Sequence, residues 1–472
     1  MDLAAMVPGM VPLLPNLRKL EWHIVRADSP FSLVFLFLSH NLRHLALEID
    51  VTDVSPASFN HFLQHLPNRS PQLTHFNLYT QVVSRDIQTE LSKCIKSLRS
   101  LKVVGLPPCY HTDVIVQALA VAPALVEMRT GWLAAQPPTP EESQVEFKEG
   151  WFRSVERVDL ELSPLRAIPL ITDPYRPRSL SRLRLTTGTL SDHDHLERFL
   201  SVVATTLPEL KLLSLNLWGP HTPLPTAIPF NSFRPVLACR LIKTFEVGHN
   251  HPVQLDEADI GAMAEAWPNL AELTFCEDPV LTGNTSQGLS LSALPLFAEK
   301  FPALKELGLF LDGAPVPPFT APPVFSNLIE LNVGTSRLDS RHATANALYI
   351  SDLCRNPVTI IKGKSAWHVS GVWDLEEDDT PYLSGSSAWA DVGRTIKAVH
   401  THRQEREKRR AEEAQRQATA ITLAVQQLTK GVETVQGSDT LEAKVKELEA
   451  ALRGQSRIPI LFAECHYLPY AC

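Results

Sequence analysis

The stretch PALKELGLFL, which begins at Pro302, carries the pattern from which most of the chain is built. Its leucines, Leu304, Leu307, Leu309 and Leu311, follow the spacing L-x-x-L-x-L-x-L. This alternation predicts a strand with one buried face, because successive side chains of a strand point to opposite sides. The proline cannot continue a preceding helix, so it marks the point where a helix ends and a strand follows.

Copies of this stretch recur along the chain. The close copies are PNLRKLEWHI from Pro15, PQLTHFNLYT from Pro71, PALVEMRTGW from Pro123, PELKLLSLNL from Pro208 and PNLAELTFCE from Pro268. Looser copies begin at His40, Lys96, Arg153, Arg178, Arg240 and Ser326. The string Pro-x-Leu-x-x-apolar is expected roughly once by chance but occurs about seven times. We therefore infer a repeat of about twelve units with a period of roughly 24 to 34 residues, as in leucine-rich and related solenoids.

Amphipathic helices are expected between the strands. SFNHFLQHLP, from Ser58 to Pro67, places its apolar residues at i, i+3, i+4 and i+7, and similar stretches begin at Asp113, Asp194 and Glu257. The apolar run FSLVFLFLS from Phe31 is expected to be a buried helix of the first unit. Strands joined by helices run parallel with right-handed crossovers. The predicted fold is therefore an α/β, leucine-rich-repeat-like right-handed solenoid with strands on its concave face and helices on its convex face.

The pattern predicts four parts along the chain. Residues 1–335 form the solenoid, interrupted by proline-rich loops near Pro137, Gly219 and Gly313. Residues 336–386 form a C-terminal cap and acidic linker, in which ALYISDLC is a closing helix and VTIIKG a last short strand. A solenoid needs a cap over its final open edge, and we expect tryptophans to supply it: Trp367, Trp373 and Trp389. Residues 387–453 form a charged helix or coiled coil, and the tail 454–472 shows no usable pattern.

The charged helix carries a weak coiled-coil seam. Ile421, Val425, Leu428, Val432 and Val435 recur at alternating steps of four and three, and alanines extend the seam back to position 411. The segment 411–435 can therefore mediate self-association, or the helix can fold back on the solenoid; the sequence leaves both alternatives open.

Composition narrows the function classes. The 472 residues carry a net charge of -8, which argues against a general nucleic-acid binder. The seven cysteines are scattered without a C-x-x-C pair, so a reducing compartment is expected, cytoplasmic or nuclear. The first residues do not resemble a secretory signal, and no apolar run approaches the ~18 residues of a membrane span. We expect an intracellular, soluble protein without membrane partners.

No motif of a known catalytic type is present. The sequence lacks G-x-G-x-x-G, G-x-x-x-x-G-K-[ST], G-x-S-x-G and H-E-x-x-H. The pairs His193/His195 and His249/His251 lack a nearby third ligand, so loop polarity explains them better than a metal site does. We expect no enzyme, no cofactor and no metal.

The side chains that alternate with the buried leucines should face solvent and form the binding surface. Arg and Tyr are among the types that most often anchor interfaces. The charge along this row changes from mixed, through an arginine-rich centre, to acidic. The candidate protein-binding residues are His75, Tyr79, Arg129, Arg157, Asp159, Glu161, Arg182, Arg184, Asn216, Glu246, Glu272, Glu306 and Phe310.

The repeat wording resembles the large fungal families of F-box/leucine-rich-repeat-like proteins. The resemblance is carried by AWPNLAELTF from Ala266, LSALPLFAEKFPALKELGLFLD from Leu291 and FSNLIELNVGTSRLD from Phe325, and covers roughly residues 10 to 410. It implies a substrate receptor of a cullin–RING ubiquitin ligase, docked through an F-box to a Skp-type adaptor. No F-box pattern precedes the first unit at Pro15, so no F-box residue is assigned. The alternative is a structural scaffold that self-associates through its C-terminal coiled coil.

Overall fold

A computed structural model describes most of the chain. The described residues are 12–24, 31–49, 55–80, 85–107, 110, 112–130, 151–161, 163–172, 177–187, 193–217, 228–249, 251–279, 288–314, 323–362 and 386–433. The chain divides into two compact units, Met1–His400 and Thr401–Cys472. The proline-rich loops, Trp367, Trp373, the acidic linker, the second half of the predicted coiled coil and the tail fall largely or wholly outside the described residues.

A parallel sheet of thirteen strands organises the first unit. The strands lie side by side in chain order, with no strand exchanged, which is consistent with a solenoid-like α/β fold. They are β1 Lys19–Ile24, β2 His44–Ile49, β3 His75–Thr80, β4 Val103–Leu106, β5 Glu127–Thr130, β6 Arg157–Glu161, β7 Arg182–Thr186, β8 Leu212–Asn216, β9 Thr244–Gly248, β10 Glu272–Phe275, β12 Glu306–Leu309, β14 Glu330–Gly334 and β15 Thr359–Lys362. Each of the twelve units predicted from sequence contributes one strand, and β15 is the predicted last strand.

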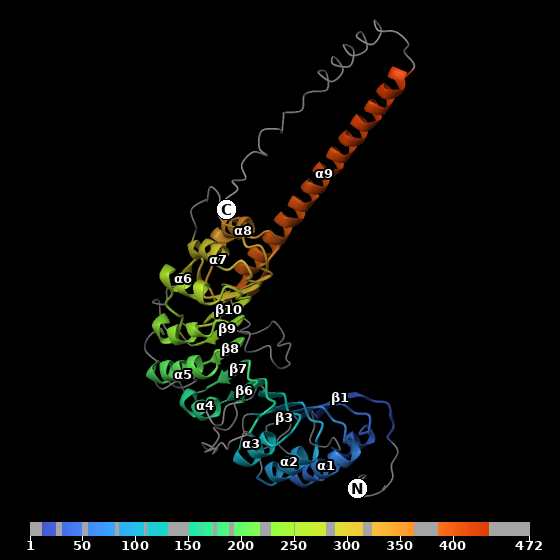
Figure 1. The fold of residues 1–472 in the computed structure, drawn as a ribbon, viewed down its shortest axis with the longest axis vertical. Helices are drawn as coiled ribbons and strands as arrows, with labels where there is room; N and C mark the ends of the chain where they lie inside the picture. The colour runs from blue at the N-terminus through green and yellow to red at the C-terminus, as the bar shows by residue number, and fades with distance from the viewer. Residues whose placement is uncertain are drawn as a thin grey trace. The chain divides into compact units, whose positions relative to one another are not determined.

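The helices of this unit lie along one side of the sheet (Figure 1). The α-helices are α1 Pro56–Arg69, α2 Arg85–Ser97, α3 Asp113–Ala120, α4 Pro164–Ile171, α5 His193–Thr206, α6 Glu257–Ala266, α7 Leu294–Lys300 and α8 Ala343–Leu353. Short 3-10 helices complete the connections: η2 Phe31–Leu36, η4 Phe230–Ala238, η5 Leu291–Ala293 and η6 Ser340–His342. The buried helix expected from Phe31 is therefore a 3-10 helix, η2. In η4, Pro235 disfavours an α-helix because proline lacks a backbone N–H donor.

The core lies between the sheet and the helices. The second residue of each strand pairs in register with the second residue of its neighbours, so Leu273, Leu307 and Leu331 form adjacent steps of one buried ladder. Aromatic side chains fill the core around β9 and β10. Phe245 contacts Trp267 with ring centroids 4.9 Å apart and Phe275 at 5.4 Å. Burial of such ladders supplies the cohesion that a single unit lacks.

The opening stretch PALKELGLFL is divided between two sheets. Strand β12 ends at Leu309, and Leu311–Asp312 (β13) pairs instead with Leu289–Ser290 (β11) in a separate two-stranded sheet. The carbonyl of Phe310, at the switch, accepts a hydrogen bond from the Leu289 backbone N–H at 2.9 Å. The strand predicted across the whole stretch is therefore broken at Phe310.

The last strand is covered by the first turns of a long helix, α9, which spans Ser386–Glu433. Ala388, Trp389, Val392 and Ile396 are buried in the core of the first unit. The indole N–H of Trp389 donates a hydrogen bond to the carbonyl of Ser336 at 2.9 Å. Trp389 thus has the capping role expected for it, and α9 belongs to the first unit as far as His400.

The second unit contains the remainder of α9. From residue 404 to residue 427 its side chains are exposed, including Ile421 at 56%, Leu423 at 53% and Val425 at 54%. In the part of the chain that the structure describes, no helix is both long enough and apolar enough to cross a membrane.

Candidate protein-binding surface

Polar side chains occupy the side of the sheet opposite the helices, which we term the polar face. Its first row is made by the first residue of each strand, and the parallel register sets these residues directly beside one another. Neighbouring strands lie about 4.8 Å apart, so adjacent side chains of a row can interact. The first row runs Lys19, His44, His75, Val103, Glu127, Arg157, Arg182, Leu212, Thr244, Glu272, Glu306, Glu330 and Thr359.

Aromatic rings lie close together in the N-terminal part of this face. The rings of His44 and His75 stack with centroids 3.9 Å apart. Burial, followed by the neighbouring His44 charge, lowers the pKa of His75, so its ring is neutral at pH 7. Tyr79 lies on the same strand, and burial raises the pKa of its hydroxyl. This part of the face therefore offers the stacked imidazole rings of His44 and His75 and the ring of Tyr79, beside the exposed ion pair of Lys19 and Glu21.

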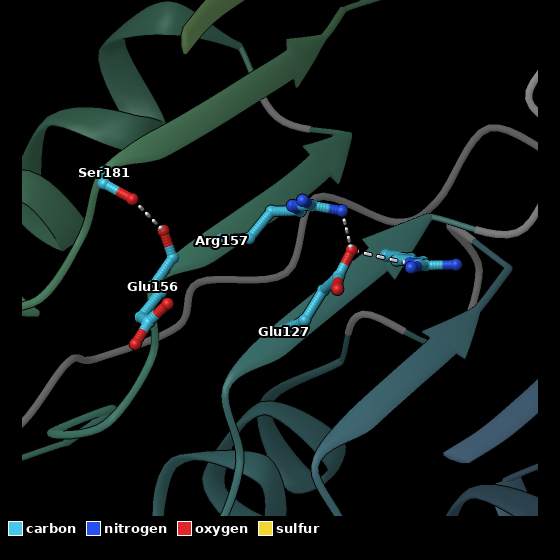
Figure 2. A network of polar contacts seen from close by, with 5 residues as sticks. Glu127, Glu156, Arg157 and Ser181 are labelled. Carbon is cyan, nitrogen blue, oxygen red and sulfur yellow. Dashed lines mark hydrogen bonds and ion pairs between the residues drawn. The ribbon is translucent and has the colours of Figure 1, made fainter. Parts of the chain in front are cut away.

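A shared carboxylate organises the centre of the face (Figure 2). Oε1 of Glu127 on β5 accepts a hydrogen bond from Arg157 Nη1 on β6 at 2.6 Å and from Arg129 Nε at 2.7 Å. Burial raises the pKa of Glu127, but the hydrogen bonds and charges of the two arginines outweigh burial, and its pKa lies below the usual value. The side chain of Glu127 is 12% exposed, whereas those of Arg129 and Arg157 are 48% and 36% exposed. The guanidinium groups therefore form the outer layer.

The next strands carry one exposed arginine and one that is bound within the sheet. Arg182 pairs in register with Arg157, and its side chain is exposed. Arg184 donates from Nε to Ser214 Oγ at 3.2 Å and from Nη2 to Glu246 Oε2 at 3.3 Å. The Ser214 hydroxyl donates to the same Glu246 oxygen at 2.6 Å. Arg184 and Glu246 therefore satisfy each other across three strands.

Three glutamates follow one another at the C-terminal part of the first row. Glu272, Glu306 and Glu330 pair in register on β10, β12 and β14. Burial raises the pKa of Glu306 and of Glu330, and for Glu306 the charges of Glu272 and Glu330 raise it further. The Thr244 hydroxyl donates to Glu272 at 2.9 Å. This contact was missed from sequence, although Thr244 occupies the same strand position as Glu272.

The structure places most of the predicted residues on this face, with two exceptions. Phe310 is only 6% exposed, so its expected exposure is wrong: the chain leaves the main sheet after Leu309 and the alternation ends there. Glu161 lies in β6, but its side chain is outside the described residues. Asp159 and Asn216 are half-buried, and the charge of Asp159 acts on Arg129.

The histidine and cysteine residues do not form a metal centre in the described part of the chain. No group of three or more His, Cys, Asp or Glu side chains there could hold a metal ion. His249 is buried, and its Nδ1 accepts a hydrogen bond from the His251 backbone N–H at 3.0 Å. Burial raises the pKa of the Cys94 and Cys354 thiols to about 12, so these thiols stay protonated.

No family model matches the chain, and no curated protein matches it. The function is therefore inferred from the geometry of the polar face and from the repeat pattern of the sequence.

Proposed function

We propose that this chain is a non-enzymatic protein-binding repeat protein that holds its partner on the polar face. In this proposal the parallel strands line the concave side of a right-handed, leucine-rich-repeat-like solenoid and the helices cover its convex side. The observation that carries it is the exposed guanidinium layer of Arg129, Arg157 and Arg182, of which Glu127 accepts one donor from each of the first two. Each guanidinium has five N–H donors, and the side chains of Arg129 and Arg157 are 48% and 36% exposed.

Within this proposal, the protein is an intracellular substrate receptor of a cullin–RING ubiquitin ligase, in the cytoplasm or the nucleus. The resemblance of the repeat sequence to F-box/leucine-rich-repeat-like proteins supports this role. Binding to a Skp-type adaptor is part of the same proposal, with no adaptor-binding residue assigned.

A second candidate function is a scaffold that self-associates through 411–435. The exposed side chains of Ile421 and Val425, at seam positions of α9, favour it. Exposed apolar side chains at a/d spacing are what a second helix would bury.

Affinity capture with charge-reversed variants tests the binding role. The double variant Arg157→Glu/Arg182→Glu should lose partners that the wild type retains, because it replaces two outward cations with anions. Arg153→Glu/Arg178→Glu is the matched control, since both side chains are exposed in the turns before β6 and β7 and the change in charge is the same. The double variant should melt at a lower temperature than the wild type, because it removes the Arg157–Glu127 hydrogen bond and places three carboxylates in register; capture is therefore compared at a temperature where circular dichroism shows every protein folded. Identical partner lists for wild type and double variant would place the binding site elsewhere.

Adaptor binding and oligomeric state separate the two roles. Co-purification with a Skp-type adaptor supports the ligase role. A stable dimer in light scattering that is lost on deletion from Thr401 onward, without adaptor, supports the scaffold role. The deletion must begin at Thr401, because residues 388–400 include buried core side chains of the first unit.

A further inference from the structure

The arginine group, Arg129, Arg157 and Arg182, gives the polar face an anion-recognising end. Arg157 and Arg182 are register partners on adjacent strands, and Arg129 joins them through the shared carboxylate of Glu127. That carboxylate lies beneath the guanidinium groups, as its 12% exposure shows. Arginine binds carboxylates through two parallel N–H donors, which suits it to acidic side chains of a protein partner.

The glutamate row, Glu272, Glu306 and Glu330, has the opposite character. Like charges directly opposite one another in a sheet are destabilising. Among the described residues no ion pair joins these three carboxylates to a cation, and burial, followed by the charges of Glu272 and Glu330, raises the pKa of Glu306. A partner that places cations over this row would relieve the repulsion as it binds.

Between the two groups, the charged side chains of the face pair with each other. Arg184 on β7 bonds to Ser214 and Glu246 on β8 and β9, the two strands that separate the arginine group from the glutamate row. From β6 to β12 the sheet order requires five strand steps, which corresponds to about 24 Å. An extended peptide covers this span with roughly seven residues.

We propose that the polar face takes a protein partner in one orientation, with an acidic segment over the arginine group and a basic segment over the glutamate row about 24 Å away. This inference rests on the proposed binding function and adds the chemistry and direction of the partner. The partner is a protein because the surface carries both positive and negative groups, and the glutamate row would repel the phosphates of a nucleic acid.

Synthetic peptides test the polarity directly. The probe is a fluorescent peptide with an acidic block and a basic block whose centres lie about 24 Å apart when extended. Comparison peptides carry two acidic blocks, two basic blocks, or the same residues in alternating order. Fluorescence anisotropy at low ionic strength should show the block peptide binding at least about tenfold tighter than each comparison, with the advantage decreasing as salt is added.

Charge-reversal variants of the arginine group and of the glutamate row provide the decisive test. Arg157→Glu/Arg182→Glu and Glu306→Lys/Glu330→Lys should each weaken binding of the block peptide at least about tenfold. The variant with all four changes should recover binding, because the flexible peptide can lie in the opposite direction. Arg153→Glu/Arg178→Glu and Glu209→Lys/Glu299→Lys are controls with equal charge changes at exposed positions outside the strands.

Two outcomes would overturn the inference. One is equal affinity for the block peptide and the doubly acidic peptide, which would leave an anion site at the arginine group alone. The other is failure of the four-change variant to regain binding while circular dichroism shows it to be folded. Either result leaves the proposed binding function standing, since that function fails only if captured protein partners ignore the reversal of Arg157 and Arg182.

Discussion

Replacing Trp389 tests the cap that α9 forms over the end of the sheet. The indole is 1% exposed and packs in the same core as Val392 and Ile396. Truncation of a buried tryptophan to alanine costs about 3–5 kcal/mol, because transfer free energy is lost and a cavity remains. Part of that cost is the Ser336 carbonyl, which loses its 2.9 Å donor; leaving a buried acceptor unsatisfied costs about 1–3 kcal/mol.

Three substitutions separate these contributions. Trp389→Ala should lower the free energy of unfolding by about 3–5 kcal/mol. Trp389→Phe keeps an aromatic ring but removes the N–H, so it should lower the free energy of unfolding by about 1–3 kcal/mol. Arg394→Ala, an exposed change on the same helix, should stay within about 0.5 kcal/mol.

The assay is urea denaturation followed by circular dichroism, together with amide hydrogen exchange. Repeat architectures can lose an end unit without global unfolding, so exchange shows where the stability is lost. Faster exchange in β15 and in residues 388–400 should accompany Trp389→Ala. A change below about 0.5 kcal/mol with unaltered exchange in β15 would refute the capping role of Trp389.

Three further predictions concern the core, the glutamate row and the second unit. Leu307→Ala should lower the free energy of unfolding by about 2–5 kcal/mol in denaturant melts, and a shift under about 0.5 kcal/mol would contradict its core position. The folded-state pKa of Glu306 lies above its ordinary value, so its ionised form destabilises the fold at neutral pH and protonation on acidification restores stability. Glu306→Gln should therefore raise the melting temperature at pH 7 and reduce the stability gained by the wild type on acidification to about pH 5; an unchanged pH profile argues against this. Ile421→Glu/Val425→Glu should convert any dimer to monomer in light scattering without altering the melting of the first unit, and persistence of the dimer would exclude the seam.

The strand positions could be predicted from sequence because one physical rule decides them locally. A parallel strand that buries alternate side chains must carry apolar residues at alternate positions. The sequence around Leu273, Leu307 and Leu331 has this alternation. The thirteen parallel strands of the sheet confirm this pattern. The same rule failed at Phe310, where a pairing with Leu289 took the chain out of the sheet.

Which residues face away from the core was predictable from the alternation, but how they interact was not. The sequence placed Arg157, Arg184 and Glu246 on one face without showing that Arg184 bonds to Glu246, whereas Arg157 shares the Glu127 carboxylate with Arg129. That difference depends on the neighbour each strand receives across the sheet, which is set by register between residues about thirty positions apart.

The sequence by itself determined the repeat, the strand positions and the change of charge from the middle of the chain to its end, because these follow from local alternation and composition. Only the tertiary structure decided that the cap is the start of α9, with Trp389 bonded to Ser336. It also decided that Glu272, Glu306 and Glu330 stand side by side on neighbouring strands. The physical reason is that stacking strands in register brings distant residues to within about 4.8 Å, and local sequence carries no information on that neighbour.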